Sequence, residues 1–211
     1  MVRDLAVAQG KELSLEIQGG DTTVDKGIIE QLKDPLMHLI RNSADHGVEG
    51  PDEREAAGKP RTGTIALRAS QSATVVTIEV MDDGRGIDSG AVGRKAVQRG
   101  LVPADDLALM SDEQVNMLVF GAGFSTSSVI TDLSGRGVGL DVVRTAIEDL
   151  RGSVALQSTP GKGSAFRIDL PVTLATARVV VARVSGICVA FPMDTVSRVR
   201  LVKREDISLI E

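Results

Sequence analysis

Hydrophobic and polar positions along the chain follow two different periods. Spacing typical of amphipathic helices occurs over residues 1–10, 25–46, 88–99, 111–120 and 140–150. Alternation typical of strands occurs over residues 13–17, 64–69, 74–83, 153–159 and 164–172. Because helices and strands are interspersed without a regular strand–helix–strand repeat, we predict an α+β fold, an α/β sandwich. Its sheet should be mixed and mainly antiparallel, with helices covering one face.

Proline and glycine interrupt these patterns at three places. Pro35 lies inside the long helical stretch, where it predicts a break or a kink. Residues 47–63 are polar and rich in glycine and proline, which predicts a loop with one helical turn. Residues 121–139 are small, polar and glycine-rich. A loop of this length in a compact domain is usually a functional lid or disordered, and we expect a lid over residues 121–134.

The pattern changes from Leu174 onward, because strand-like stretches follow one another and helical spacing is absent. This change predicts an all-β segment at the C-terminus, with a boundary near Pro171. A length of 211 residues is enough for one ample domain together with part of a second.

The composition narrows the range of functions. Hydrophobic residues make up 42% of the chain, which supports a core, and the absence of Trp and Tyr makes that core aliphatic. A formal net charge of −5 argues against general nucleic-acid binding. Cys188 is the only cysteine, which excludes a disulfide framework and favours a reducing compartment. Because no run of about 18 apolar residues occurs, we expect a cytoplasmic protein that is not inserted in a membrane.

The only two histidines of the chain, His38 and His46, lie eight residues apart with Asn42 midway between them. At helical pitch, steps of four residues keep all three side chains on one polar ridge. Leu39 and Ile40 fall on another face of the same helix, which is typical of a helix packed on one side. The residues alone leave open whether this ridge is a solvated surface or part of a site.

Three glycine clusters lie far apart, at residues 82–88, 135–141 and 161–166. In the first, Asp82 ends an apolar strand, where its carboxylate can accept a hydrogen bond from the exocyclic amine of a base. The second precedes a helix, where backbone N–H groups and the helix dipole favour a phosphate. It lacks the Gly-Lys-Ser/Thr of a Walker loop and the leading strand of a Rossmann fingerprint. Three unrelated turns are the structural alternative.

The order of these motifs resembles the ATP-binding domain of the histidine kinase, gyrase, Hsp90 and MutL superfamily. HLIRN corresponds to its asparagine-bearing helix, FGAGF to its phenylalanine box, and DDGRG, GRGVG and GKGS to its three glycine boxes. DPLMHLIRNSADHGVE, GFST and SGRGVGLDVV are especially similar to the CheA family of chemotaxis histidine kinases. The resemblance extends to about residue 171. Ala122 and Leu140 stand where proline and methionine are usual, and neither change removes a polar contact.

This resemblance implies that the chain binds ATP and Mg²⁺. Asn42 and His38 would be the metal site, and His38 would be the catalytic residue because it stands where related ATPases carry a glutamate base. A neutral imidazole is a weak base, so His38 could instead hydrogen-bond a metal-bound water or the γ-phosphate. The cofactor-binding residues that the resemblance implies are Asn42, His46, Asp82, Gly84, Gly86, Lys95, Phe124, Ser125, Thr126, Gly135, Arg136, Gly137, Val138, Gly139, Leu140 and Ser164.

The resemblance also implies a domain order. Residues 1–10 would end a dimerisation helix, residues 11–171 would form the catalytic domain, and residues 172–211 would begin a CheW-like regulatory domain, left incomplete. The expected partners are a separate phosphoacceptor domain of the same kinase, a CheW-like adaptor, chemoreceptors and a downstream CheY-like response regulator. Homodimerisation would use segments outside this chain.

Three alternatives remain at this stage. An ATPase of the same superfamily should carry the glutamate that position 38 lacks. An anti-sigma-factor serine kinase should end soon after the third glycine cluster, whereas this chain continues into an all-β segment. An adaptor with a degenerate nucleotide site should have lost some of the motifs.

Overall fold

The computed structural model describes residues 2–124, 139–172, 179–184 and 186–198. Contacts divide the chain into two compact units, Met1–Thr173 and Leu174–Glu211. Most of the segment expected to form a lid lies outside the described residues, and only its first residues, 121–124, are described.

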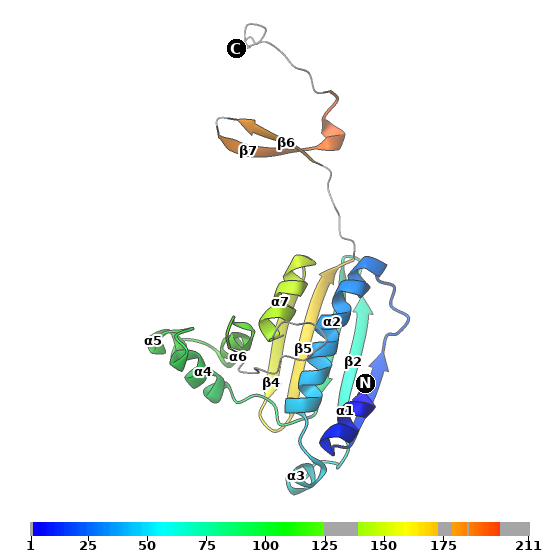
Figure 1. Cartoon of the computed structure of the whole chain (residues 1–211), viewed down its shortest axis with the longest axis vertical. Coiled ribbons are helices and arrows are strands. Elements are labelled where there is room, and N and C mark those ends of the chain that lie inside the picture. The colour runs from blue at the N-terminus through cyan, green and yellow to red at the C-terminus, as the bar shows by residue number, and fades with distance from the viewer. Residues whose placement is uncertain (1, 125–138, 173–178, 185, 199–211) are drawn as a thin grey trace. The chain divides into compact units, whose positions relative to one another are not determined.

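The first unit is built on a five-stranded sheet (Figure 1). The strand order is β1 (Leu13–Gln18), β2 (Gly63–Gln71), β3 (Val75–Asp82), β5 (Gly163–Pro171) and β4 (Ser153–Thr159). The β1–β2 pair is parallel and every other pair is antiparallel. This confirms the prediction of a mixed, mainly antiparallel sheet, with β4 and β5 forming the hairpin predicted around PGKG.

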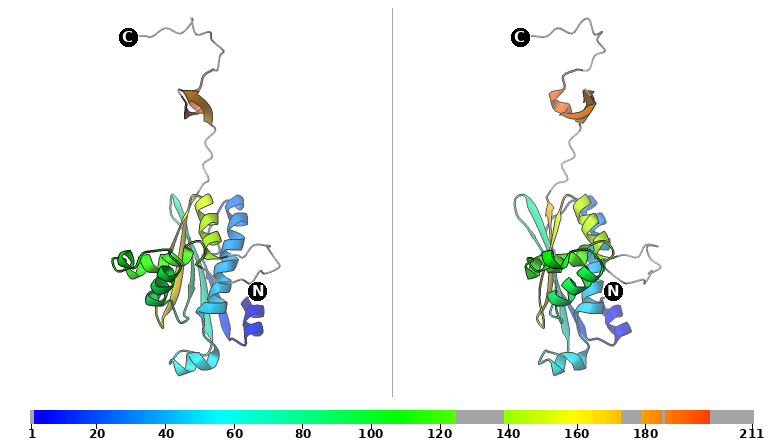
Figure 2. Two further views of the ribbon diagram at one scale, coloured as in Figure 1. Left: turned by 60° about the vertical axis from the view of Figure 1, so that its left-hand side comes forward. Right: turned by 90° about the vertical axis from the view of Figure 1, so that its left-hand side faces the viewer.

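Helices cover one face of this sheet, as predicted. They are α1 (Val2–Gln9), α2 (Lys26–Asn42) and α7 (Leu140–Asp149). Both views of Figure 2 place α2 and α7 on the same side of the strands. Alternate residues of β3 are buried beneath them, which brings Val80 and Asp82 to the same face of the strand. The sheet therefore ends in a carboxylate at the border of its hydrophobic core.

The remaining helices are short and lie outside this layer. They are α3 (Pro51–Ala56), α4 (Ser89–Gln98), α5 (Ala104–Leu107) and α6 (Asp112–Met117), the last followed by a 3₁₀ turn, Leu118–Phe120. α4 and α6 correspond to predicted helices, and α3 is the turn expected in the glycine-rich loop, whereas α5 was not predicted. α6 contacts β4 at the edge of the sheet. None of the described helices is long and apolar enough to cross a membrane.

The long helical stretch is not broken at Pro35, and it does not remain α-helical as far as His46. α2 does not end at Pro35, because Leu32 and Leu39 on either side are buried in the core and hold the chain helical through the proline. The α-helix then gives way at Ser43–Gly47 to a π-helical turn, called η1, in which Val48 N–H donates to the Ser43 carbonyl over 2.8 Å. The regular ridge predicted from His38 to His46 is therefore wrong beyond Asn42.

The second unit contains an antiparallel hairpin of β6 (Val179–Val184) and β7 (Ile187–Pro192), followed by a 3₁₀ turn, Met193–Thr195. The strands agree with the all-β character predicted here. Val181 and Ile187 are 65% and 68% exposed. A two-stranded hairpin cannot bury such residues by itself.

Candidate functional site

Asp82 is the buried carboxylate at the end of β3, with 8% of its surface exposed. It accepts hydrogen bonds from the Ser43 hydroxyl and from Gly84 N–H, each over 3.0 Å. Burial raises the pKa of Asp82 above its ordinary value, and the hydrogen bonds from Gly84, Ser43 and the Ser164 backbone oppose that rise. A carboxylate has about four acceptor positions, so these donors leave room for one from a ligand.

The first glycine cluster packs against η1 and the β4–β5 hairpin. A Cβ on Gly84 would overlap the carbonyl oxygen of Gly47 in η1, so a larger residue could not approach this closely. Gly86 has a φ of +70°, and a Cβ there would overlap the Thr159 carbonyl oxygen of the hairpin. The first and third glycine clusters thus lie side by side, with η1 beside them.

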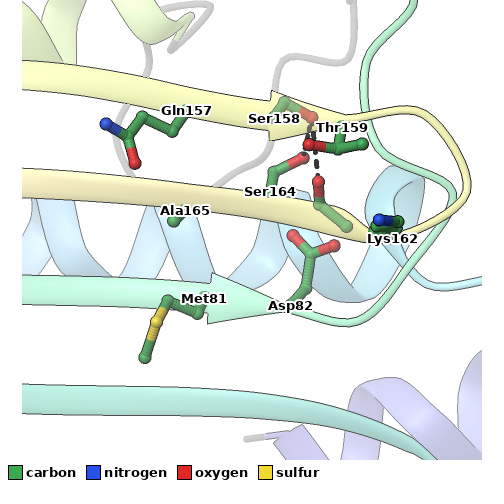
Figure 3. Close-up of a pocket in the computed structure, with 9 residues that line it drawn as sticks. Met81, Asp82, Gln157, Ser158, Thr159, Lys162, Ser164 and Ala165 are labelled. Atoms are coloured by element: carbon green, nitrogen blue, oxygen red, sulfur yellow. Dashed lines mark hydrogen bonds between the residues drawn. The ribbon is translucent and has the colours of Figure 1, made fainter.

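Ser164 faces Asp82 across the β3–β5 pair. Figure 3 shows both side chains at the hairpin end of the sheet, together with Ser158. The Ser158 and Ser164 hydroxyl oxygens lie 3.0 Å apart, and Ser158 accepts a hydrogen bond from Ile87 N–H over 2.8 Å. The hairpin is therefore tied to the loop that follows Asp82.

A cavity of about 260 Å³ opens at this end of the sheet. Its lining residues are Met81, Asp82, Gln157, Ser158, Thr159, Lys162, Gly163, Ser164 and Ala165. Met81, Ala165 and Gln157 lie side by side in register, one position from Asp82, so they occupy the sheet face opposite to its carboxylate. The cavity does not reach Asn42 or His38, and it is not the whole of the predicted site.

His38 and Asn42 are both half-buried on α2, whereas His46 is exposed on η1. Within the described part of the chain, neither the imidazole of His38 nor the amide of Asn42 makes a hydrogen bond. Burial lowers the pKa of His38, the charge of Arg41 lowers it further, and the charge of Asp141 opposes both. His38 is therefore neutral at pH 7, where it can offer one N–H and one acceptor.

The described end of the second glycine cluster lies near this ridge. Gly139 is the N-cap of α7 and Leu140 its first residue. α7 packs along α2, and the charge of Asp141 in the first turn of α7 opposes the lowering of the His38 pKa. The other predicted residues of this region, Ser125, Thr126, Gly135, Arg136, Gly137 and Val138, lie outside the described residues.

Lys95 and Phe124 lie together at the start of the segment expected to form a lid. The Lys95 ammonium lies 4.9 Å from the centroid of the Phe124 ring, within range of a cation–π interaction. Arg99 donates to the carbonyl oxygens of Gly123 and Phe124. The structure thus brings Lys95 to Phe124, and no described contact links it to Asp82.

Sequence reasoning missed Ser43, Gly47 and Ser158. Ser43 directly follows Asn42, yet its bond to Asp82 joins residues 39 positions apart. Gly47 presents its Cα to the Asp82 carboxylate, where an added Cβ would lie 3.0 Å from Oδ2. The one sign of these residues in the sequence was that polar residues continue past Asn42. The sequence pattern does not show which distant residue would bond to Ser43.

Comparison with protein families matches residues 29–174 to the family described as histidine kinase-, DNA gyrase B-, and HSP90-like ATPase. The matched residues include α2 from Ile29 onward, Asp82 and the β4–β5 hairpin. The chain belongs to this family.

Relatives of this chain include three proteins named chemotaxis protein CheA. The protein of Halobacterium salinarum is 44% identical over 98% of this chain and 31% of its own length. That of Treponema pallidum is 45% identical over 100% of this chain and 26% of its own length. That of Bacillus subtilis is 41% identical over 98% of this chain and 31% of its own length. The chain thus spans about a third or less of the length of the curated relatives it matches. The predicted resemblance to the CheA family is confirmed.

Proposed function

We propose that this chain is the ATP-binding catalytic domain of a chemotaxis histidine kinase, which transfers the γ-phosphate of Mg-ATP to a histidine on a separate phosphoacceptor domain. The observation that carries this proposal is the hydrogen bond from Ser43 to Asp82. It joins the end of the asparagine-bearing helix to the buried carboxylate, so a nucleotide with its base at Asp82 would have its phosphates towards Asn42 and His38. The CheA relatives support the same function.

Asp82 would recognise adenine. Its present partners, Ser43 and Gly84, are both donors, and the exocyclic amine of adenine is another. A buried carboxylate needs such partners to offset the loss of water. The adenine amine would therefore give the buried Asp82 carboxylate a further hydrogen-bond donor. A base without an amine at this position would bind less tightly.

Asn42 fits a magnesium ion that is shared with a nucleotide. Within the described residues there is no group of three or more His, Cys, Asp or Glu side chains that could hold a metal by itself. Mg²⁺ prefers oxygen ligands and keeps several waters, so one amide oxygen together with phosphate oxygens suits it. When bound, the ion would neutralise charge on the phosphates. Asn42 would hold it, and His38 would orient a metal-bound water or a phosphate oxygen.

The partners would follow from the CheA relatives. The acceptor histidine would lie on another domain, because His38 and His46 would both belong to the nucleotide site. A CheW-like adaptor, chemoreceptors and a CheY-like response regulator would act with the whole kinase, which would be a homodimer. Residues 172–211 would begin the regulatory domain, and the exposed Val181 and Ile187 of its hairpin would pack against the rest of that domain.

Calorimetric titration with ATP tests the proposed site. The chain should bind ATP saturably, and Mg²⁺ should tighten the binding because Asn42 would hold the ion, which would offset the charge of the phosphates. An absence of binding under both conditions would contradict the proposal. An affinity that is the same with and without Mg²⁺ would contradict the role of Asn42.

The affinity for ADP should fall as the pH is lowered from neutral. Burial raises the pKa of Asp82 above the ordinary 3.8, so the ionised form that accepts the adenine amine is lost at a higher pH than for an exposed aspartate. Affinity measured in the parent chain and in Asp82→Asn checks this. The parent should lose affinity for ADP as the pH falls through the raised pKa of Asp82, whereas the affinity of the variant should not depend on this group. Parallel losses in the two proteins would show that another group titrates.

His38→Gln should lower the affinity for ATP and the kcat/KM of phosphotransfer by the same factor. The factor should be about three- to tenfold, the effect of losing one hydrogen bond. A neutral imidazole that only orients a water or a phosphate oxygen would stabilise bound ATP and the transition state of transfer by the same amount. Affinity from calorimetry and transfer rate from labelled ATP are compared in the same variant. Unchanged affinity with collapsed transfer would identify His38 as a general base instead.

A further inference from the structure

A cluster of charged side chains is buried directly behind the turn that follows Asp82. Arg54 of α3 is 1% exposed, and its guanidinium donates to the carboxylates of Glu49 over 3.2 Å and Asp83 over 2.9 Å. Its Nε donates to the Pro60 carbonyl oxygen over 2.7 Å. The Lys59 ammonium donates to the same Glu49 carboxylate over 2.8 Å. We call Glu49, Arg54 and Lys59 the positioning cluster.

The positioning cluster holds one peptide group in particular. The carbonyl oxygen of Asp83 accepts from Arg54 over 3.2 Å and from Lys59 over 3.0 Å. The N–H of the same peptide belongs to Gly84 and donates to the Asp82 carboxylate over 3.0 Å. Because a peptide group is planar, fixing its oxygen also fixes the direction of its N–H. Lys59 holds the next carbonyl, that of Gly84, over 2.7 Å.

The charges of this cluster are fully paired despite their burial. Burial alone would raise the pKa of Glu49, but hydrogen bonds from Lys59 and its own backbone, with the charges of Lys59 and Arg54, bring it below the ordinary value. Glu49 therefore stays ionised at neutral pH. Buried ion pairs are weak contributors to net stability, whereas their hydrogen bonds impose a defined geometry. The geometry imposed here is that of the turn beside Asp82.

We propose that Glu49, Arg54 and Lys59 are positioning residues that aim the Asp82 carboxylate at the exocyclic amine of adenine and so set the selectivity for the base. The inference rests on the proposed function, because it needs a nucleotide at Asp82. None of the three residues donates to the Asp82 carboxylate itself, whose partners are Ser43, Gly84 and the Ser164 backbone. They act through the Asp83–Gly84 peptide, whose N–H holds one carboxylate oxygen while the Ser43 hydroxyl holds the other.

Lys59→Met in the full chain tests this inference, with ADP and inosine diphosphate as probes. Inosine diphosphate has a carbonyl oxygen where adenine has its amine, and an N1–H where adenine has an acceptor. The ratio of the two affinities therefore measures recognition of this edge of the base, and its loss in Asp82→Asn isolates the part that depends on Asp82. The parent chain should prefer ADP by about tenfold or more, the effect of a mispaired buried polar group. Lys59→Met should reduce this preference about fivefold or more, and Lys59→Arg, which keeps a cation and its donors, should restore most of it.

Arg61→Met is the matched control. Arg61 belongs to the same segment and pairs with Asp52 and Glu55 on its outer side, over 3.0 and 2.8 Å, without touching the turn. Its removal should leave the ADP preference unchanged. In Asp82→Asn the preference is already lost, so adding Lys59→Met should change the ratio no further. If Lys59→Met does not fold, as judged by its melting transition, Lys59→Gln takes its place.

The outcomes are separable. A parent chain that does not bind ADP, or that binds both probes equally, would refute the proposed reading of adenine and this inference with it. A parent that prefers ADP, together with a Lys59 variant that keeps the full preference, would refute the positioning role and leave the proposed function intact. A Lys59 variant that weakens both probes by the same factor would equally refute it, because that is the effect of general destabilisation.

Discussion

Asp82→Asn is expected to weaken ATP binding by about 5- to 150-fold, equivalent to about 1–3 kcal/mol for a mispaired buried polar group. Gly84 N–H and the Ser43 hydroxyl donate to this side chain, and the adenine amine would be a further donor. An amide offers one oxygen in place of two, so the adenine amine would meet an NH₂ group. Calorimetric titration with ATP checks the loss. Unchanged affinity in this variant would refute the assignment of Asp82 to adenine.

The same variant should keep its stability, which separates a binding defect from unfolding. The folded-state pKa of Asp82 is raised, so its ionised form disfavours the folded state at every pH above that pKa, and the penalty disappears as the pH falls below the unfolded value. A neutral amide removes this penalty at pH 7. Without ligand, the amide oxygen can still accept from Gly84 N–H and the amide NH₂ can donate to the Ser43 hydroxyl oxygen, so the mispairing arises only with the adenine amine. The melting temperature of Asp82→Asn should therefore be no lower than that of the parent. Glu79→Gln, on the opposite face of the same strand, is the control that should alter neither binding nor melting.

Asn42→Ala is expected to lower phosphotransfer by about 100-fold or more, because charge neutralisation by a metal ion contributes several kcal/mol to the transition state. Binding of ATP in the absence of Mg²⁺ should change little, since the amide would act through the ion. Transfer rates from labelled ATP and affinities with and without Mg²⁺ measure the two effects.

Gln31→Ala is the matched control for Asn42→Ala. Gln31 carries a carboxamide on the same helix, is exposed, and bonds to the Gly27 carbonyl, so its removal should leave transfer intact. A transfer rate in Asn42→Ala close to that of the parent would show that Asn42 does not hold the metal. Equal losses in both variants would indicate a defect of helix α2 instead.

The sheet and its covering helices could be predicted because an element that is buried on one face has apolar residues at regular intervals in the sequence. The alternation in β3 predicted a strand that ends at Asp82, and the spacing in α7 predicted its apolar face. The continuation of α2 through Pro35 could not be predicted, because local preference favours a break and packing of Leu32 and Leu39 overrides it. The π-helical turn η1 was also missed, since it depends on contacts with the sheet.

Residues of the candidate site could be predicted where a local motif identifies them. They could not be predicted where the fold brings together residues that are far apart in the sequence. Asp82 could be found from its place at a strand end. The donor Ser43 could not, because the pairing appears only when α2 lies over the sheet. Arg54 is the clearest case: an arginine in a polar loop is normally exposed, yet it is buried because carbonyl oxygens and two carboxylates surround its guanidinium.

Transfer of labelled γ-phosphate from Mg-ATP to a supplied phosphoacceptor domain tests the central claim most directly. Both histidines of this chain would be held at the nucleotide, and phosphoryl transfer needs an acceptor positioned in line with the γ-phosphate. We therefore expect acid-labile label on the added domain, none on this chain, and loss of the signal in Asn42→Ala. Acid-labile label on the isolated chain, acid-stable label on the acceptor, or release of free phosphate without any labelled protein would contradict the account.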